Sequence, residues 1–341
     1  MNIQAAIRQV AGGGNLDRHD TEKVFRAIMQ GEATPAQIGG LLIALSIKGE
    51  TVDEIAGAAT VMRDFAVPVH CDPEHLVDTC GTGGDGTQTF NISTCAAFVV
   101  AAAGGRVAKH GNRSISSRCG SADVLESAGV NIDLDAAAIA RCIEEAGVGF
   151  MFAPNHHGAT RHAAGPRREL GMRTMFNVLG PMTNPAATPN QVVGVFDPAW
   201  VPRCAEVLRE LGSRHVMVVH AADGLDEFSI AAPTFVAELS DGEINTYTVT
   251  PEQLGVTPGR IEDLKVDSAE SSLAMIKAVL DNTPGPALEI VCLNAGAALY
   301  VADLAPDHAA GVARAREIIE SGAARQRLDT LVRLSRELSA A

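Results

Sequence analysis

From residue 75 onward, short apolar segments alternate with helical patterns, and this alternation constrains the fold more than any other feature of the chain. HLVDTC (75–80), RVAKHG (106–111) and VGFMFAP (148–154) have the length and composition of strands, and helical patterns separate them. QVVGVFD (191–197) and HVMVVH (215–220) repeat the pattern further along. Strands that alternate with helices are typical of a parallel sheet with helices packed on it. The sequence therefore predicts an α/β domain with a mostly parallel sheet covered by helices.

The first 68 residues predict helices without an intervening strand. TPAQ (34–37) and TVDE (51–54) are capping boxes, and each opens a segment with helical periodicity. A further helical segment, rich in turn residues, interrupts the α/β pattern at about 165–187. We therefore predict a small all-α domain from residues 1–68 plus about 165–187, and a larger α/β domain from 69–164 and 188–341.

The remaining segments give weaker signals. FVAELSDGEINTYTV (235–249) predicts a hairpin that turns at Asp241-Gly242. From Ser268 onward the pattern is mostly helical, although ALEIVCLNAGAALYV (287–301) is ambiguous by period alone.

Composition limits the classes of partner and compartment. The 27 basic and 41 acidic residues give a formal charge of −14, which disfavours binding to nucleic acid or to an acidic membrane. The seven cysteines include no C-x-x-C pair, so neither a disulfide framework nor a zinc site is expected. We find no signal-peptide pattern, and the longest uncharged apolar stretch is too short to span a bilayer. A cytoplasmic protein without a membrane partner is predicted.

A glycine-rich segment, DTCGTGGDGTQTFNIST (78–94), follows the first predicted strand. Gly81, Gly83 and Gly86 match the dinucleotide fingerprint G-x-G-x-x-G. Glycines at a strand-to-helix turn allow a phosphate to approach the backbone amides, and this suits a dinucleotide or a phosphorylated sugar equally. A tight turn without any ligand is the third interpretation.

Two features disfavour the dinucleotide interpretation. The loop continues through residues 87–91 before its helix begins, whereas the third glycine of the fingerprint normally lies within the helix. About twenty residues on, Lys109 and His110 stand where an acidic group for the ribose is expected. A Walker loop is excluded because no G-K-[ST] follows.

Hydroxyl and amide side chains follow two successive predicted strands. Asn91-Ile92-Ser93-Thr94 offers donors at the start of a helix, or merely caps it. KHGNRSISSRCGS (109–121) adds a cation and further hydroxyls after the next strand. Together the two loops suggest a ligand with more than one phosphate.

Five motifs together resemble the anthranilate phosphoribosyltransferase family. They are GTGGD (81–85), N-x-S-T (91–94), KHGN (109–112), GSADVLE (120–126) and RTMFNVLGPMTNP (173–185). The resemblance extends from about residue 78 to 230 and agrees with a helical start. It implies transfer of the phosphoribosyl group from 5-phosphoribosyl-1-pyrophosphate to the amine of anthranilate, with pyrophosphate released. It also implies two Mg²⁺ ions per subunit and a homodimer formed through the helical domain.

The resemblance assigns roles to particular residues. It implies that the phosphoribosyl donor is bound by Gly81, Gly84, Asp85, Thr89, Asn91, Ser93, Thr94, Lys109, His110, Gly111, Asn112, Ser117 and Ser121. It implies that anthranilate contacts Gly81, Asn112, His157 and Arg167, and that Mg²⁺ is bound by Ser93, Asp226 and Glu227. Whether His110 or another group removes the amine proton is left open.

The chemistry of the residues agrees with several of these roles. Asp226 and Glu227 follow the strand at 215–220, and open α/β sheets bind ligands at that end of their strands. Mg²⁺ commonly takes one or two carboxylates together with substrate phosphates, although a solvated acidic turn is the alternative. The Arg167 guanidinium suits a benzoate carboxylate, with a surface salt bridge as its alternative.

One segment departs from the family pattern. His157-Gly158-Ala159-Thr160 stands where the family frequently has H-P-A-M, and this leaves the details of the acceptor entrance open. A pyrimidine nucleoside phosphorylase-like enzyme and a non-catalytic nucleic-acid-binding relative are the alternatives. A strict Mg²⁺ requirement would distinguish a phosphoribosyltransferase from the phosphorylase-like enzyme. The net charge of −14 disfavours the nucleic-acid-binding relative.

Overall fold

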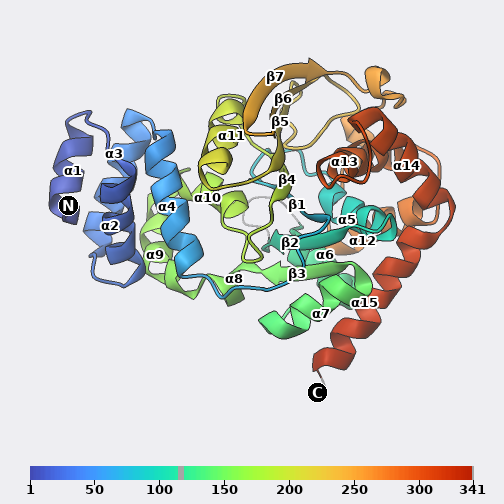
Figure 1. The fold of residues 1–341 in the computed structure, drawn as a ribbon, viewed down its shortest axis with the longest axis horizontal. Helices are drawn as coiled ribbons and strands as arrows, with labels where there is room; N and C mark the ends of the chain where they lie inside the picture. The colour runs from blue at the N-terminus through green and yellow to red at the C-terminus, as the bar shows by residue number, and fades with distance from the viewer. Residues whose placement is uncertain (114–118, 340–341) are drawn as a thin grey trace.

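The computed structural model describes residues 1–113 and 119–339 and begins with four helices. They are α1 (Ile3–Ala11), α2 (Arg18–Met29), α3 (Pro35–Lys48) and α4 (Val52–Asp64), grouped at one end of the molecule (Figure 1). Both predicted capping boxes are present: Thr34 with Gln37 opens α3, and Thr51 with Glu54 opens α4. The helical start of the chain is confirmed.

The sheet has seven strands in the order β3-β2-β1-β4-β5-β6-β7. The first five in this order are parallel, β6 is antiparallel to β5, and β7 is antiparallel to β6. The strands are β1 (Leu76–Gly81), β2 (Arg106–Gly111), β3 (Val148–Phe152), β4 (Asn190–Gly194), β5 (His215–Ala221), β6 (Thr234–Ser240) and β7 (Glu243–Val249). The predicted mostly parallel sheet is confirmed.

Helices join the strands and cover both faces of the sheet (Figure 1). Between β1 and β5 lie α5 (Ile92–Ala102), α6 (Ser121–Ala128), α7 (Ala136–Ala146), α8 (Ala153–His156), α9 (Arg161–Leu170), α10 (Phe176–Met182) and α11 (Trp200–Glu210). After β7 come α12 (Ala269–Leu280), α13 (Pro286–Val301), α14 (His308–Glu320) and α15 (Ala323–Ser339). Short 3-10 helices occupy Gly158–Thr160, Glu252–Leu254 and Ile261–Leu264.

Alternating side chains of the sheet belong to two separate cores. Met217 and Val219 of β5 pack into a core with α5, α13 and α15, whereas Val216 and Val218 pack into the other. The second core also contains the buried residues of α1–α4, α10 and α11, so one face of the sheet is continuous with the helical start of the chain. This arrangement confirms a small helical part beside a larger α/β part.

Helices α9 and α10 come from the middle of the chain but pack against the N-terminal helices. α9 contacts α2 and α3, and α10 contacts α4. These contacts support grouping residues 165–187 with 1–68, although the domain boundaries themselves stay a prediction.

Two local predictions have clear outcomes. Ser240 pairs with Glu243 across Asp241-Gly242, and both turn residues have positive φ, so the hairpin is confirmed. The ambiguous segment 287–301 forms α13, a helix that is buried on nearly all sides. None of the seven cysteines forms a disulfide within the described part of the chain. Within residues 1–113 and 119–339, no helix is both long and apolar enough to cross a membrane.

Candidate active site

The predicted donor-binding residues gather where the direction of strand succession reverses. From β1 the chain proceeds outward to β2 and β3, whereas β4 returns to the other side of β1 and is followed by β5. β1 ends at Gly81 and β4 ends at Gly194, and these two residues are paired. In open α/β sheets a reversal of this kind leaves a crevice at the carboxyl ends of the strands, which is where ligands bind.

The glycines of the loop after β1 serve two different purposes. Gly83, Gly84 and Gly86 have φ of +65°, +77° and +76°, a region that favours glycine. Gly81 has no such φ, but a Cβ at this position would collide with the Asp226 carboxylate. A Cβ on Gly194 would collide with the Asp226 backbone in the same way. Both strands therefore end in glycine because the segment after β5 lies directly against them.

The two carboxylates predicted to bind magnesium face this loop. The Gly83 amide donates to Asp226 Oδ2 at 2.8 Å, and the Ser93 amide donates to Glu227 Oε1 at 3.2 Å. Desolvation by the surrounding protein, reinforced by Asp85 and Glu227, raises the pKa of Asp226 well above its usual range. Desolvation likewise raises the pKa of Glu227 to about 7, although Lys109 opposes the shift. Negative charge is thus concentrated here without a matching number of cations.

Lys109 is the buried cation of the site. It lies on β2 with 2% of its surface exposed, and its ammonium donates to the Thr79 carbonyl at 2.5 Å and to Ser93 Oγ at 3.2 Å. Burial lowers its pKa, and Asp78 opposes the shift. An ammonium has three N–H donors, so one is left to face a ligand.

Three hydrogen bonds and one ring contact shape the outer part of the loop. Thr87 donates to both Asp85 oxygens, from its hydroxyl at 2.6 Å and from its amide at 3.2 Å. The Arg173 guanidinium donates to the Gly84 carbonyl and stacks 4.1 Å above the Phe196 ring. Arg173 belongs to one of the five motifs, but no local pattern marks it as a partner of the glycine loop.

The end of the loop is held by a segment from the last third of the chain. Phe90 donates its amide to the Leu264 carbonyl at 2.9 Å, and Val266 donates to the Gln88 carbonyl at 3.0 Å. Between them Thr89 forms a β-bridge with Lys265. Residues 264–272 lie outside the region of resemblance, so motif comparison missed them.

Asn91 occupies the N-cap position of α5, but its side chain makes no capping hydrogen bond. Simple N-capping is therefore the wrong interpretation of this residue. Its amide instead contacts Ser272 and Cys119. Three residues further on, the Thr94 hydroxyl is buried and has no hydrogen-bond partner within the described part of the chain.

The remaining predicted donor contacts lie beside the end of β2. Ser121 begins α6, and its hydroxyl donates to the Asn112 carbonyl at 3.4 Å. A Cβ on Gly111 would collide with that hydroxyl, so β2 and α6 approach each other closely here. Ser117 lies outside the described residues.

Two histidines form the predicted acceptor side. The His110 and His157 rings lie 5.0 Å apart, and both are buried. Burial, reinforced by neighbouring histidines, lowers the pKa of His110 to about 3 and that of His157 to about 4. Both rings are therefore neutral at pH 7, and His110 is a poor proton acceptor at that pH.

Arg167 lies on α9, half-buried, with its guanidinium 4.8 Å above the Phe176 ring. Burial lowers its pKa. Among the described residues it forms no ion pair, so the salt-bridge interpretation is not supported. No described contact joins it to Gly81 or Asn112.

The predicted magnesium ligands are all oxygen donors. The described residues contain no cluster of three or more histidine, cysteine or acidic side chains arranged as a ready-made metal site. Two carboxylates and one hydroxyl, all oxygen donors, are what Mg²⁺ uses when substrate phosphates and water complete its coordination. The raised pKa of Asp226 marks a position where a cation would relieve repulsion. These residues fit Mg²⁺ bound together with a phosphorylated ligand.

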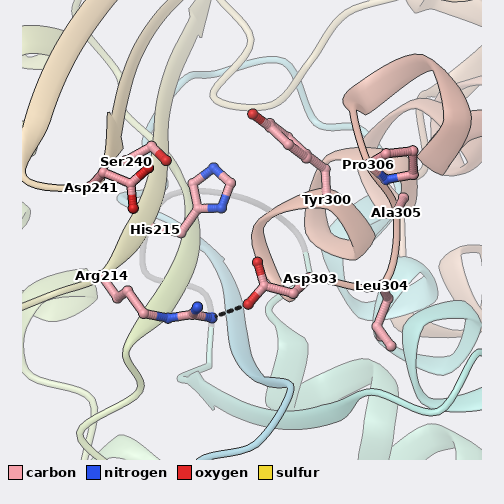
Figure 2. Close-up of a pocket in the computed structure, with 9 residues that line it drawn as sticks. All are labelled: Arg214, His215, Ser240, Asp241, Tyr300, Asp303, Leu304, Ala305 and Pro306. Atoms are coloured by element: carbon pink, nitrogen blue, oxygen red, sulfur yellow. Dashed lines mark ion pairs between the residues drawn. The ribbon is translucent and has the colours of Figure 1, made fainter.

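A cavity of about 510 Å³ lies elsewhere, and Figure 2 shows its lining. Arg214 pairs with Asp303 across it at 2.5 Å, while His215 and Tyr300 are hydrogen-bonded to Glu238. Those polar groups already have protein partners, and none of the lining residues belongs to the predicted site.

Comparison with known proteins agrees with this geometry. Residues 73–325 match the glycosyl transferase family a/b domain, and residues 4–66 match its helical bundle domain. The chain is 61% identical to the anthranilate phosphoribosyltransferase of Thioalkalivibrio sulfidiphilus over 97% of its length and 98% of the relative. It is 57% identical to that of Methylococcus capsulatus over the whole of both chains.

Solved structures show the same fold. The anthranilate phosphoribosyltransferase of Thermus thermophilus is 42% identical, with a TM-score of 0.92 over 97% of this chain and 99% of its own. The Saccharomyces cerevisiae enzyme in complex with PRPP and Mg has a TM-score of 0.88 at 23% identity over 98% of both chains, which shows a shared fold. The chain belongs to the anthranilate phosphoribosyltransferase family of glycosyl transferases.

Proposed function

We propose that this chain transfers the phosphoribosyl group of 5-phosphoribosyl-1-pyrophosphate to the amine of anthranilate, a step of tryptophan biosynthesis. The observation that carries the proposal is the meeting of Asp226 and Glu227 with the glycine loop and Ser93 at the carboxyl edge of the sheet. Relatives that share 54–61% of its sequence over nearly their full length bear the name of this activity.

The donor is bound along the loops after β1 and β2. Gly81 and Gly84 allow close approach of the phosphates, and Lys109 contributes its remaining N–H. Asp85, Thr89, Asn91, Ser93, Thr94, His110, Gly111, Asn112, Ser117 and Ser121 complete the proposed donor site.

Displacement at the ribose C1 carbon depends mainly on stabilising the leaving group. Lys109 donates to the oxygens on which charge accumulates, and it is already held in place by Thr79 and Ser93. Ser93, Asp226 and Glu227 would hold two Mg²⁺ ions, which supply further positive charge at the pyrophosphate when bound. The yeast structure with PRPP and Mg supports this choice of ligand and metal.

Anthranilate is placed by Asn112, His157, Arg167 and the Gly81 backbone. The guanidinium of Arg167, which has no ion-pair partner in the described part of the chain, is available for the benzoate carboxylate. The attacking amine is neutral at pH 7, so in-line binding is sufficient for attack. The pKa of about 3 gives little support to His110 as a base.

The double variant Asp226→Asn, Glu227→Gln tests the carboxylates. We expect loss of turnover, measured as the decrease of anthranilate fluorescence on addition of the donor with and without Mg²⁺. The fold is expected to persist, because the raised pKa values show that these two sites accept a neutral side chain. Glu144→Gln, Glu145→Gln, an exposed acidic pair on α7, is the matched control. Normal turnover in the first double variant would exclude the proposed metal site.

We also propose a homodimer formed through the helical domain and a cytoplasmic location. The dimer rests on the family resemblance, and the location rests on the sequence patterns described above. Light scattering of the purified chain measures the first: a mass near 71 kDa, twice the 35.5 kDa of one chain, is expected. A mass of one chain at micromolar concentration would contradict the dimer.

A further inference from the structure

The Asn91 side chain is held by two donors from distant parts of the chain. Its Oδ1 accepts from Ser272 Oγ at 2.7 Å and from Cys119 Sγ at 3.2 Å. The Asn91 backbone amide also donates to Ser272 Oγ, at 3.1 Å. Ser272 lies on α12, 181 residues later in the chain, and is fully buried.

These contacts determine which end of the amide is available to a ligand. Because the oxygen already accepts from a hydroxyl and a thiol, the NH₂ group lies on the other side of the side chain. One of its protons is donated to the Cys119 carbonyl, at 3.4 Å, and an amide NH₂ has two donors. Turning the amide over would remove the acceptor that Ser272 and Cys119 share.

We infer that Ser272, assisted by Cys119, is a positioning residue that makes Asn91 present an N–H rather than its carbonyl oxygen to the phosphoribosyl donor. This inference rests on the proposed function, in which Asn91 contacts the donor. An N–H is the correct partner for a phosphate oxygen, which only accepts, whereas a carbonyl oxygen would repel a phosphate. Ser272 therefore influences donor binding without touching the donor.

The surroundings of Ser272 support a role in shaping the loop. In the same segment, the Leu264 carbonyl accepts from the Phe90 amide, and the Val266 amide donates to the Gln88 carbonyl. Residues 264–272 therefore hold the end of the loop. Without the Ser272 hydroxyl, the backbone of the loop keeps these bonds. What is lost is the acceptor of the Asn91 backbone N–H and one of the two donors that orient the Asn91 side-chain amide.

Replacement of Ser272 tests the inference against a control on the same helix. We expect Ser272→Ala to weaken binding of the Mg²⁺-loaded donor about tenfold by calorimetry without anthranilate, equivalent to about 1.4 kcal/mol. The KM for the donor should rise similarly, and the KM for anthranilate should stay within about twofold. Among the described residues, the hydroxyl that Ser271→Ala removes is bonded only to Asp267 and Ser268, so donor affinity should not change. Equal donor affinity in Ser272→Ala and the wild type would overturn the inference.

Asn91→Asp provides a second test that does not depend on Ser272→Ala folding. The new carboxylate still accepts from Ser272 and Cys119 but has no N–H, so we expect a loss of donor affinity of 100-fold or more with an unchanged melting temperature. Wild-type affinity in this variant would show that no N–H is used and would overturn the inference. A wild-type chain that binds the donor but never consumes anthranilate would contradict the proposed reaction. The orientation of Asn91 would still be tested by donor binding in these two variants.

Discussion

Gly81 shows how a single missing side chain can shape a site. Its position at the end of β1 is next to the Asp226 carboxylate, which occupies the space where a Cβ would lie. Glycine is needed at position 81 because a side chain would collide with Asp226, whereas Gly83 is needed for its backbone conformation, with a φ of +65°.

Gly81→Ala should therefore displace the Asp226 carboxylate while changing the fold little. We expect kcat/KM for the phosphoribosyl donor to fall by about 100-fold or more, because a small misplacement at a reacting centre has effects of this size. Steady-state kinetics with anthranilate fluorescence measures the effect, and thermal melting serves as the control. Wild-type kinetics would show that the carboxylate does not depend on this space.

Among the elements, the junction of the first four helices depends on one buried carboxylate. Glu54 of α4 is fully buried and accepts from the Leu16 amide, from the Thr51 amide and from Lys48 Nζ, all within 2.9 Å. It thus joins the loop before α2, the end of α3 and the start of α4.

Glu54→Ala should destabilise the chain strongly, because it leaves the buried Lys48 ammonium without its carboxylate partner and the Leu16 and Thr51 amides without their acceptor. We expect the free energy of unfolding to fall by about 3–5 kcal/mol in urea titrations. Thr34→Ala, which removes the exposed cap of α3, should cost about 1 kcal/mol. Equal losses in the two variants would show that the Glu54 network contributes nothing beyond capping.

The whole molecule carries buried neutral histidines, and these make its stability depend on pH. Burial lowers the pKa of His110 to about 3 and those of His157 and His308 to about 4, whereas an unfolded chain has histidines near 6.5. Below pH 6.5 the unfolded state therefore binds more protons than the folded state. The stability that these histidines contribute is complete above pH 6.5 and is lost as the pH falls toward 4.

We expect each of the three histidines to lower the free energy of unfolding by about 1.4 kcal/mol per pH unit between pH 6.5 and 5. Asp226 and Glu227 act in the opposite direction, because their raised pKa values let the folded state bind more protons than the unfolded state in this range. Urea titrations at several pH values measure the slope. His308→Gln, which lies far from the proposed site in the sequence and removes one of the three, should give a shallower slope. An equal pH dependence in His308→Gln and the wild type would contradict the prediction.

Much of the architecture could be predicted because its causes are local. The capping boxes at Thr34 and Thr51, the turn at Asp241-Gly242 and the strand–helix alternation all act within a few residues of one another. Segment 287–301 could not be assigned, because α13 is buried on nearly all sides and has no polar face to reveal its period.

The sequence by itself determined the α/β class, the helical start and the family, since local periodicity and five short motifs carry that information. Only the tertiary structure decided that β4 pairs with β1, which brings Asp226 against Gly81. It also decided that Ser272 holds Asn91 and that Arg173 reaches Gly84. The physical reason is that these contacts join residues about 90 to 180 positions apart, so no local pattern encodes them and only the packing of the whole chain brings them together.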